Sequence, residues 1–308
     1  MAVLMITYDT EMFGPEFAAL HQWLGDRVND HSITSRWIEK ASELHTRLDA
    51  PFTSFIVGKL IELHPGEFKS MVEEVPQMDV QSHTYSHATL KTIVCEPSAE
   101  YLKVRPYTAG PGTDEERGVS VVPGASLEVI RSELLRTRDL IRNVCGVDSI
   151  GISGPGGYYR GLSDRPDVLQ VVWDTGNRIS RCYSRNQDDF GPIPWDKQPF
   201  WYKAQGFPEV LEIPVQDWQD VFWRDLYGWN NISGYLDHLK RGVDIIVERD
   251  LAWATGLHEW SVIENDPEMT VVEGLIKYAQ DKGVEVLSCK QYYERRLSDR
   301  IGANGGHS

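Results

Sequence analysis

Short apolar segments rich in β-branched residues recur along the 308-residue chain and alternate with longer amphipathic stretches. Each has the length of a β-strand, and most are preceded or followed by helical periodicity. The segments are residues 3–7, 53–57, 78–81, 149–153, 178–182, 210–215, 251–255 and 284–287. Strands that alternate with helices pair mainly in parallel, in a sheet that is either open or closed into a barrel. Without an internal repeat or a low-complexity linker, residues 1–308 are predicted to form one α/β domain.

One helix can be predicted in detail. Ser126 can cap its start and Glu128 suits its first turn, while Gly146 is a plausible end. The apolar residues that share one face of this helix are Leu127, Ile130, Leu134, Ile141 and Val144.

Residues 96–124 interrupt the alternation with a stretch rich in proline, glycine and charge. A loop of this length is uncommon in a compact domain unless it is functional or disordered. We predict an inserted loop that is largely ordered and forms part of a pocket wall or a subunit contact. Tyr101 and Tyr107 are its expected contact residues.

Charge and composition exclude several kinds of partner. The formal net charge of -15, with no evident basic stripe, argues against nucleic acid and anionic membranes. No apolar run approaches the roughly 20 residues needed to span a bilayer, and the N-terminus lacks the features of a signal peptide. The four cysteines are scattered and form no CxxC pair, as in reduced cytosolic proteins. A cytoplasmic protein is therefore expected.

His83 and His87 are separated by three residues, so a helical turn or a tight loop can direct both imidazoles to one metal ion. A carboxylate from another element could complete the site and leave positions open. Asp9 and Glu11, far upstream, are the candidates. A hydrolase uses such an open position because a metal-bound water can be deprotonated near neutral pH.

Six segments, in chain order, resemble the motifs of the polysaccharide deacetylase family, the NodB-type carbohydrate esterases. They are residues 6–11, 51–58, 81–87, 151–157, 212–218 and 257–260. The third matches the family's His-Ser/Thr-x-x-His metal motif fully. The resemblance implies a distorted (β/α) barrel of about seven mainly parallel strands. It is closest to the intracellular branch, which includes peptidoglycan-type deacetylases and allantoinase-like amidohydrolases.

The resemblance also implies a metal site. His83, His87 and Glu11 are its expected ligands, with Zn2+ as the expected ion and Co2+ or Ni2+ as alternatives. Asp9 is then the general base that takes a proton from the metal-activated water. The reverse assignment, with Asp9 on the metal, stays open.

Two further roles concern the departing amine. His258 is expected to protonate the leaving nitrogen, and Asp217 to hold His258 in its protonated tautomer. Trp260 and Trp218, which adjoin motif residues, and Tyr85 are the expected substrate-binding side chains.

The sequence departs from the family pattern at two positions. Thr10 stands where the family has the second of two adjacent aspartates, and Glu11 could restore that pair. Ser153 replaces the arginine that normally pairs with the base, for which Arg160 or Arg105 could substitute.

These features predict a metal-dependent hydrolase that removes an N-acyl group, acetyl above all, from an amino-sugar-containing substrate. The expected partners are a small-molecule or oligosaccharide substrate and further copies of the chain in a homo-oligomer. One alternative is an allantoinase-type amidohydrolase acting on a non-sugar amide. Another is a non-catalytic, glycan-binding relative, which Thr10 and Ser153 would explain.

Overall fold

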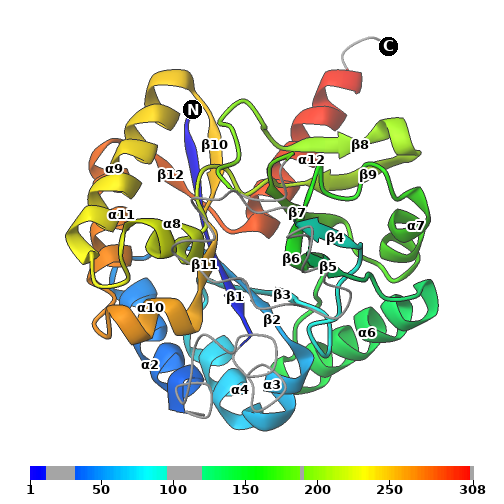
Figure 1. Cartoon of the computed structure of the whole chain (residues 1–308), viewed down its shortest axis with the longest axis horizontal. Coiled ribbons are helices and arrows are strands. Elements are labelled where there is room, and N and C mark those ends of the chain that lie inside the picture. The colour runs from blue at the N-terminus through cyan, green and yellow to red at the C-terminus, as the bar shows by residue number, and fades with distance from the viewer. Residues whose placement is uncertain (12–31, 96–119, 188–190, 306–308) are drawn as a thin grey trace.

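A mainly parallel β-sheet with helices packed around it forms the centre of the molecule (Figure 1). The computed structural model describes residues 1–11, 32–95, 120–187 and 191–305. Within these ranges, one sheet of ten strands has the main order β10-β1-β2-β3-β6-β7-β9-β8, and β11 and β12 also pair with β1. Its strands are β1 (Val3–Thr10), β2 (Phe52–Ile56), β3 (Met78–Ser82), β6 (Gly151–Tyr159), β7 (Ile179–Arg185), β8 (Phe200–Tyr202), β9 (Phe207–Glu212), β10 (Ala252–Ala254), β11 (Leu257–His258) and β12 (Glu285–Val286).

Helices follow most of the strands, as the sequence pattern predicts. They are α2 (Ser32–Arg47), α3 (Gly58–Leu63), α4 (Pro65–Glu74), α6 (Leu127–Leu140), α7 (Pro166–Asp174), α8 (Asp220–Tyr227), α9 (Ile232–Arg249), α10 (Glu259–Asn265), α11 (Thr270–Asp281) and α12 (Cys289–Gly305). A π-helical turn (Ile141–Cys145) and a 3-10 turn (Lys203–Gln205) complete them. No described helix is both long and apolar enough to cross a membrane.

The predicted α/β architecture with a mainly parallel sheet is confirmed. Along the main path only the β8–β9 pair is antiparallel. The count of ten strands exceeds the predicted seven because β8, β11 and β12 add short strands of two or three residues.

The side chains of β1 alternate between the two faces of the sheet. Leu4 and Ile6 pack outward in a core shared with α2, α9 and α11. Val3 and Met5 face the interior, together with apolar side chains of β2, β7 and β9. Because successive side chains of a strand point to opposite faces, Asp9 continues this interior row at the carboxyl end of β1. Polar groups at the carboxyl ends of parallel strands gather at one end of such a fold.

Helix α6 agrees closely with its prediction. The Ser126 side chain accepts a hydrogen bond from the Val129 amide, so it caps the helix as expected. Gly146 ends the following π-helical turn in the left-handed conformation, with φ of 71°. Ile130, Leu134 and Ile141 are buried. Leu127 differs from the prediction because it is 39% exposed and lines a groove between α6 and α7 instead of the core.

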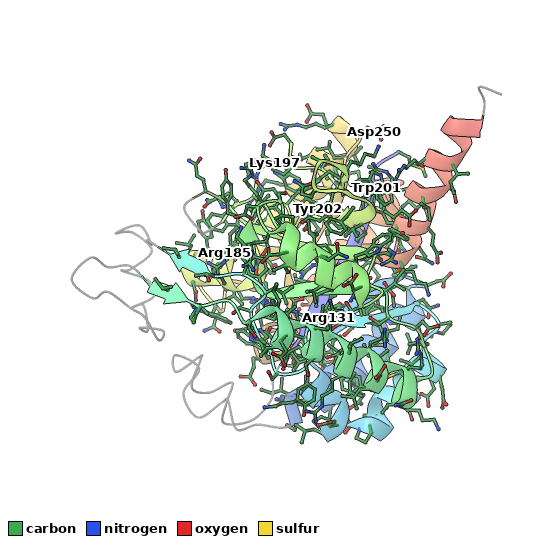
Figure 2. All side chains as sticks on the ribbon, turned by 90° about the vertical axis from the view of Figure 1, so that its right-hand side faces the viewer. Arg131, Arg185, Lys197, Trp201, Tyr202 and Asp250 are labelled. Atoms are coloured by element: carbon green, nitrogen blue, oxygen red, sulfur yellow. The ribbon has the colours of Figure 1, made fainter. Side chains whose placement is uncertain are left out.

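The two ends of the predicted inserted loop form a small sheet of their own. Strands β4 (Ile93–Cys95) and β5 (Ser120–Val122) pair in the antiparallel sense, and Figure 2 shows them extending from the side of the molecule. Residues 96–119, with Tyr101 and Tyr107, lie outside the described residues.

Candidate active site

His83 and His87 lie in a tight loop that follows β3, not in a helix. The backbone takes the left-handed conformation at Thr84 and at His87, both with φ of 61°. This path brings the two imidazole rings to 5.0 Å between centroids. Their Nε2 atoms lie 3.1 and 2.9 Å from the same oxygen, Oε2 of Glu11. Among the described residues, these three side chains form a group whose ligand atoms all lie within 4.8 Å of one another.

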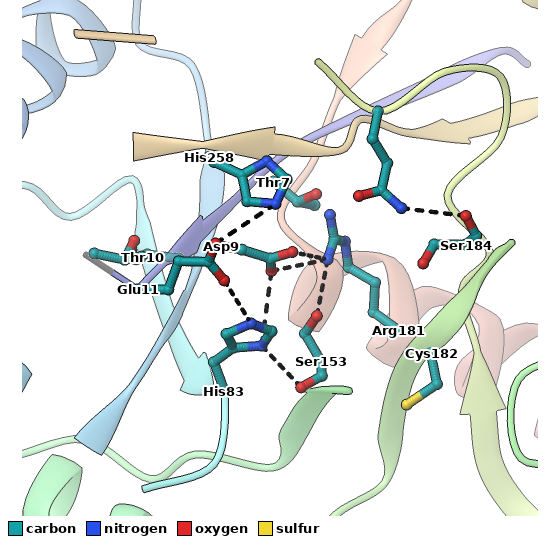
Figure 3. A network of polar contacts seen from close by, with 12 residues as sticks. Thr7, Asp9, Thr10, Glu11, His83, Ser153, Arg181, Cys182, Ser184 and His258 are labelled. Carbon is teal, nitrogen blue, oxygen red and sulfur yellow. Dashed lines mark hydrogen bonds and ion pairs between the residues drawn. The ribbon is translucent and has the colours of Figure 1, made fainter. Parts of the chain in front are cut away.

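The hydrogen bonds around His83 suit a metal ligand. Its Nδ1 lies 2.9 Å from the backbone oxygen of Ser153 (Figure 3). Because a carbonyl oxygen can only accept, Nδ1 carries a proton, and in a neutral ring Nε2 then presents a lone pair. That lone pair faces the carboxylate of Glu11, an arrangement that a shared cation stabilises. Two imidazoles and one carboxylate are a donor set that fits Zn2+ and related ions. A hydrogen bond from the other ring nitrogen to a backbone carbonyl, such as that from His83 to Ser153, commonly orients a metal-binding histidine.

Glu11 is held on several sides and stays ionised. It is only 4% exposed, its amide donates to Glu259, and the indole of Trp260 donates to its Oε1 at 3.3 Å. Burial raises the pKa of Glu11, but the nearby charges of His87 and His258 and the close contacts of both loop histidines with the carboxylate outweigh that effect. The net pKa therefore lies well below the ordinary value.

Thr10, between the two carboxylates, points the other way. Its hydroxyl lies 2.7 Å from the hydroxyl of Ser54 on β2, and it is buried. Strand alternation thus places Asp9 and Glu11, not Asp9 and residue 10, on the side of the histidines. The Asp-x-Glu spacing supplies two carboxylates to the site despite the threonine.

Arg181, on β7, is the arginine that contacts Asp9. Its Nη1 donates to both carboxylate oxygens and to the Ser153 hydroxyl (Figure 3). Its Nη2 donates to the backbone oxygen of Thr255. Burial raises the pKa of Asp9, but the charge of Arg181, with those of His83 and His258, brings it below the ordinary value.

This contact corrects the expected substitutes for the missing motif arginine. Arg160 follows β6 in a left-handed turn, with φ of 60°, whereas both carboxylate oxygens of Asp9 are bound by Arg181. Arg105 lies outside the described residues. The sequence signal for Arg181 is its place in the middle of a predicted strand, because a guanidinium buried there requires a buried partner.

His258 lies opposite Asp9 in the register of β11 and β1, and its Nε2 is 3.8 Å from Glu11. Asp220, the first residue of α8, lies 2.6 Å from its Nδ1 and accepts its backbone N–H at 2.9 Å. Burial lowers the pKa of His258, but the charges of Asp220, Glu11 and Asp9 have a larger, opposite effect. The net pKa is raised to about 10. The ring is therefore an imidazolium at neutral pH.

The predicted partner of His258, Asp217, is corrected by this geometry. Asp217 lies three residues earlier in a left-handed turn, with φ of 64°, and its Oδ2 is 2.6 Å from Nε2 of His238 on α9. The backbone of Asp217 is fixed by two hydrogen bonds to Ile193. Its side chain is thereby directed to α9, and the side chain of Asp220 is directed to the site.

Two of the predicted substrate-binding residues make close contacts within the protein. Trp260 is 1% exposed and stacks on Trp229 with 5.9 Å between ring centroids, so its faces are covered by protein. Tyr85 donates from its hydroxyl to Glu62, and the guanidinium of Arg136 covers its ring at 3.5 Å. The burial of Trp260 contradicts its predicted role in substrate binding. The role of Tyr85, which is half-buried, stays a prediction.

Trp218 is half-buried and lies against Gly191, where a Cβ would come within 2.9 Å of the indole. Its role in substrate binding stays a prediction.

Comparisons with known proteins agree with the fold and the motifs. The polysaccharide deacetylase family model matches residues 26–171. A search of curated proteins found no match. A provisionally assigned polysaccharide deacetylase from Mycobacterium smegmatis has a similar structure, with a TM-score of 0.65 at 15% identity over 97% of this chain and 91% of that chain.

Two further solved structures are similar. A provisionally assigned polysaccharide deacetylase from Pseudomonas aeruginosa PAO1 gives a TM-score of 0.61 at 18% identity, covering 95% of this chain and 90% of that chain. Puue allantoinase gives 0.61 at 16% identity, covering 95% and 89%. At these identities the structural similarity establishes a shared fold.

Proposed function

We propose that this chain, in which residues 26–171 match the polysaccharide deacetylase family model, is a metal-dependent hydrolase that removes an N-acyl group, acetyl above all, from an amino-sugar-containing substrate. Hydrolysis of carbon–nitrogen bonds other than peptide bonds is the enzyme class that the sequence predicts, and the family model agrees with it. One observation carries the proposal: Glu11, His83 and His87 converge on one point that lies beside Asp9 and His258.

Glu11, His83 and His87 would hold the metal. A divalent ion bound there supplies Lewis acidity toward the amide carbonyl and the attacking water. Glu11 is favoured over Asp9 as the carboxylate ligand because its Oε2 lies within 3.1 Å of both Nε2 atoms. Asp9 instead lies 3.9 Å from Nδ1 of His83, the nitrogen that bonds to Ser153.

Asp9 is the proposed general base. Its lowered pKa keeps it ionised at neutral pH, so it can accept the proton of the attacking water. Arg181 fixes the carboxylate from behind with its bifurcated hydrogen bond.

His258 is the proposed general acid. Held by Asp220 through Nδ1, it directs Nε2 toward the same side as Glu11 and can donate a proton to the leaving nitrogen. A protonated ring is the form that this step requires, and the carboxylates around it favour that form.

The alternatives differ in their support. An allantoinase-type reaction on a ureide stays in consideration because Puue allantoinase has the same fold with a TM-score equal to that of one deacetylase structure. The non-catalytic alternative rests on Thr10 and Ser153, which depart from the family pattern. Glu11 and Arg181 supply a carboxylate and a guanidinium in their place, which argues against it. Cytoplasmic location and homo-oligomerisation stay predictions of the sequence.

A substrate panel tests the proposal. Protein supplied with Zn2+, Co2+ or Ni2+ would be assayed on N-acetyl amino sugars, their oligosaccharides, formamides and ureides, with released acid and ammonia measured. Acetate release from an N-acetyl sugar, absent in the His83→Ala/His87→Ala variant, is the expected result. Turnover of ureides alone would favour the amidohydrolase. Glycan binding without any turnover would favour the non-catalytic alternative.

A further inference from the structure

The loop that carries both histidines is held by two helices that contribute no ligand. On one side, the first two amides of α3 donate to the loop, from Gly58 to the Thr84 oxygen at 2.9 Å and from Lys59 to the Tyr85 oxygen at 3.0 Å. These bonds satisfy backbone groups in a segment that has no hydrogen-bond ladder of its own.

On the other side, Glu133 of α6 binds Ser86, the residue that precedes His87. One carboxylate oxygen accepts the Ser86 amide at 2.7 Å, and the other accepts the Ser86 hydroxyl at 2.9 Å. Both residues are half-buried. Hydrogen bonds to a carboxylate are shorter and stronger than neutral ones, and two from one residue also fix its orientation.

The same face of α6 also contacts Tyr85, the residue before Ser86. Arg136, three positions after Glu133, lies over the ring of Tyr85 at 3.5 Å. Glu62 of α3 accepts from both, at 2.8 Å from the Tyr85 hydroxyl and 3.0 Å from the Arg136 guanidinium. The segment between the two histidines is thus clamped from α3 and α6 together.

This clamp matters because His87 has a left-handed backbone, with φ of 61°. A residue other than glycine rarely adopts that conformation, and surrounding contacts must enforce it. The Ser86 amide belongs to the Tyr85–Ser86 peptide group, and the Ser86 hydroxyl lies on the residue directly before His87. Fixing both groups therefore limits where the imidazole can point. Nε2 of His87 then lies 2.9 Å from Glu11.

We propose that Glu133 is a positioning residue of the metal site. Its carboxylate fixes Ser86 and thereby directs His87 toward the ligand group of Glu11 and His83. The inference rests on the proposed function, because it requires that these three residues bind a metal ion.

Metal affinity, measured on metal-free protein, tests this directly. Zn2+ would be titrated calorimetrically, or against a chelating dye, into the wild type, Glu133→Ala and Glu133→Gln. We expect Zn2+ affinity to fall about 10- to 100-fold in Glu133→Ala, the scale of a lost contact behind a metal ligand. Glu133→Gln should lose less, because its amide oxygen can still accept one of the two bonds.

Ser126→Ala is the matched control for a purely structural effect. It removes the cap of the same helix, where the Ser126 hydroxyl accepts the Val129 amide, without touching the loop. Its unfolding temperature should fall while its Zn2+ affinity stays within about twofold of the wild type. Retained affinity in both Glu133 variants, or an equal loss in Ser126→Ala, would overturn the proposal.

The His83→Ala/His87→Ala variant separates this inference from the metal site itself. If the wild type binds one Zn2+ that this variant does not, the site stands whatever the Glu133 variants do. If the wild type binds no Zn2+ at these residues, the proposed metal site fails, and the role of Glu133 fails with it.

Discussion

Nη1 of Arg181 donates to both carboxylate oxygens of Asp9, at 2.9 and 3.0 Å, and to the hydroxyl of Ser153 at 2.9 Å. One guanidinium nitrogen on β7 thus fixes a side chain of β1 and one of β6. Ser153 and Arg181 are direct register partners in neighbouring strands. A serine on β6 leaves the space that the longer side chain from β7 occupies.

Removing this guanidinium should disable the base. We expect Arg181→Ser to lower kcat by about 10²-fold or more, because Asp9 loses the group that fixes it and favours its charge. Moving the arginine to the register partner, in Ser153→Arg/Arg181→Ser, should recover part of that loss. Steady-state hydrolysis of the best substrate from the panel measures both variants.

Arg142→Ser is the control, since Arg142 pairs with Asp148 at the surface. An Arg181→Ser enzyme as active as Arg142→Ser would contradict the role of Arg181.

The pH dependence should report the His258–Asp220 pair. Because the carboxylates around it raise the pKa of His258 from 6.5 to about 10, the imidazolium persists through neutral pH and is lost as the pH rises through about 10. Asp220→Asn removes the strongest of the raising charges. The alkaline limb of kcat/KM should then move down by about one pH unit or more.

Asp217→Asn provides the comparison, because Asp217 contacts His238 instead. The pH profile of this variant should overlay that of the wild type. An alkaline limb that moves in Asp217→Asn and not in Asp220→Asn would restore the original pairing predicted from the sequence.

Gly58 should tolerate no side chain. A Cβ at this position would lie 2.8 Å from the Tyr85 ring and 3.1 Å from its backbone, where the first amides of α3 meet the histidine loop. We expect Gly58→Ala to cost about 1–3 kcal/mol in the free energy of unfolding, as overpacking in a tight core does. Denaturant unfolding measures this.

Gly66→Ala, in α4, is the reference, because a Cβ there meets nothing within 4 Å. Equal stability of the two alanine variants would show that the loop can move away from α3 at no cost.

The fold could be predicted from the sequence because local periodicity and strand spacing determine it. All eight apolar segments overlap strands of the sheet, and the Ser126 cap and the Gly146 end of helix α6 follow from local chemistry. The metal ligands could also be predicted from the sequence, because His83 and His87 belong to one short motif. Glu11 lies two residues from Asp9, on the same face of the extended chain.

The partners of the catalytic side chains could not be predicted in this way. Arg181 reaches Asp9 across 172 positions of sequence, and only the register of β6 and β7 places it there. Asp217 and Asp220 lie only three residues apart and are both distant from His258 in the sequence, and the turn at Asp217 decides which of them contacts it. The burial of Trp260 depends on Trp229, which packs on it from the segment after α8.

The central claim is that Glu11 binds the metal and Asp9 acts as the base. Metal content by elemental analysis, measured together with turnover in Asp9→Asn and Glu11→Gln, tests it most directly. The account predicts that Asp9→Asn keeps a stoichiometric metal ion and loses about 10²-fold or more in turnover, whereas Glu11→Gln loses the metal. Metal lost in Asp9→Asn and retained in Glu11→Gln would contradict it.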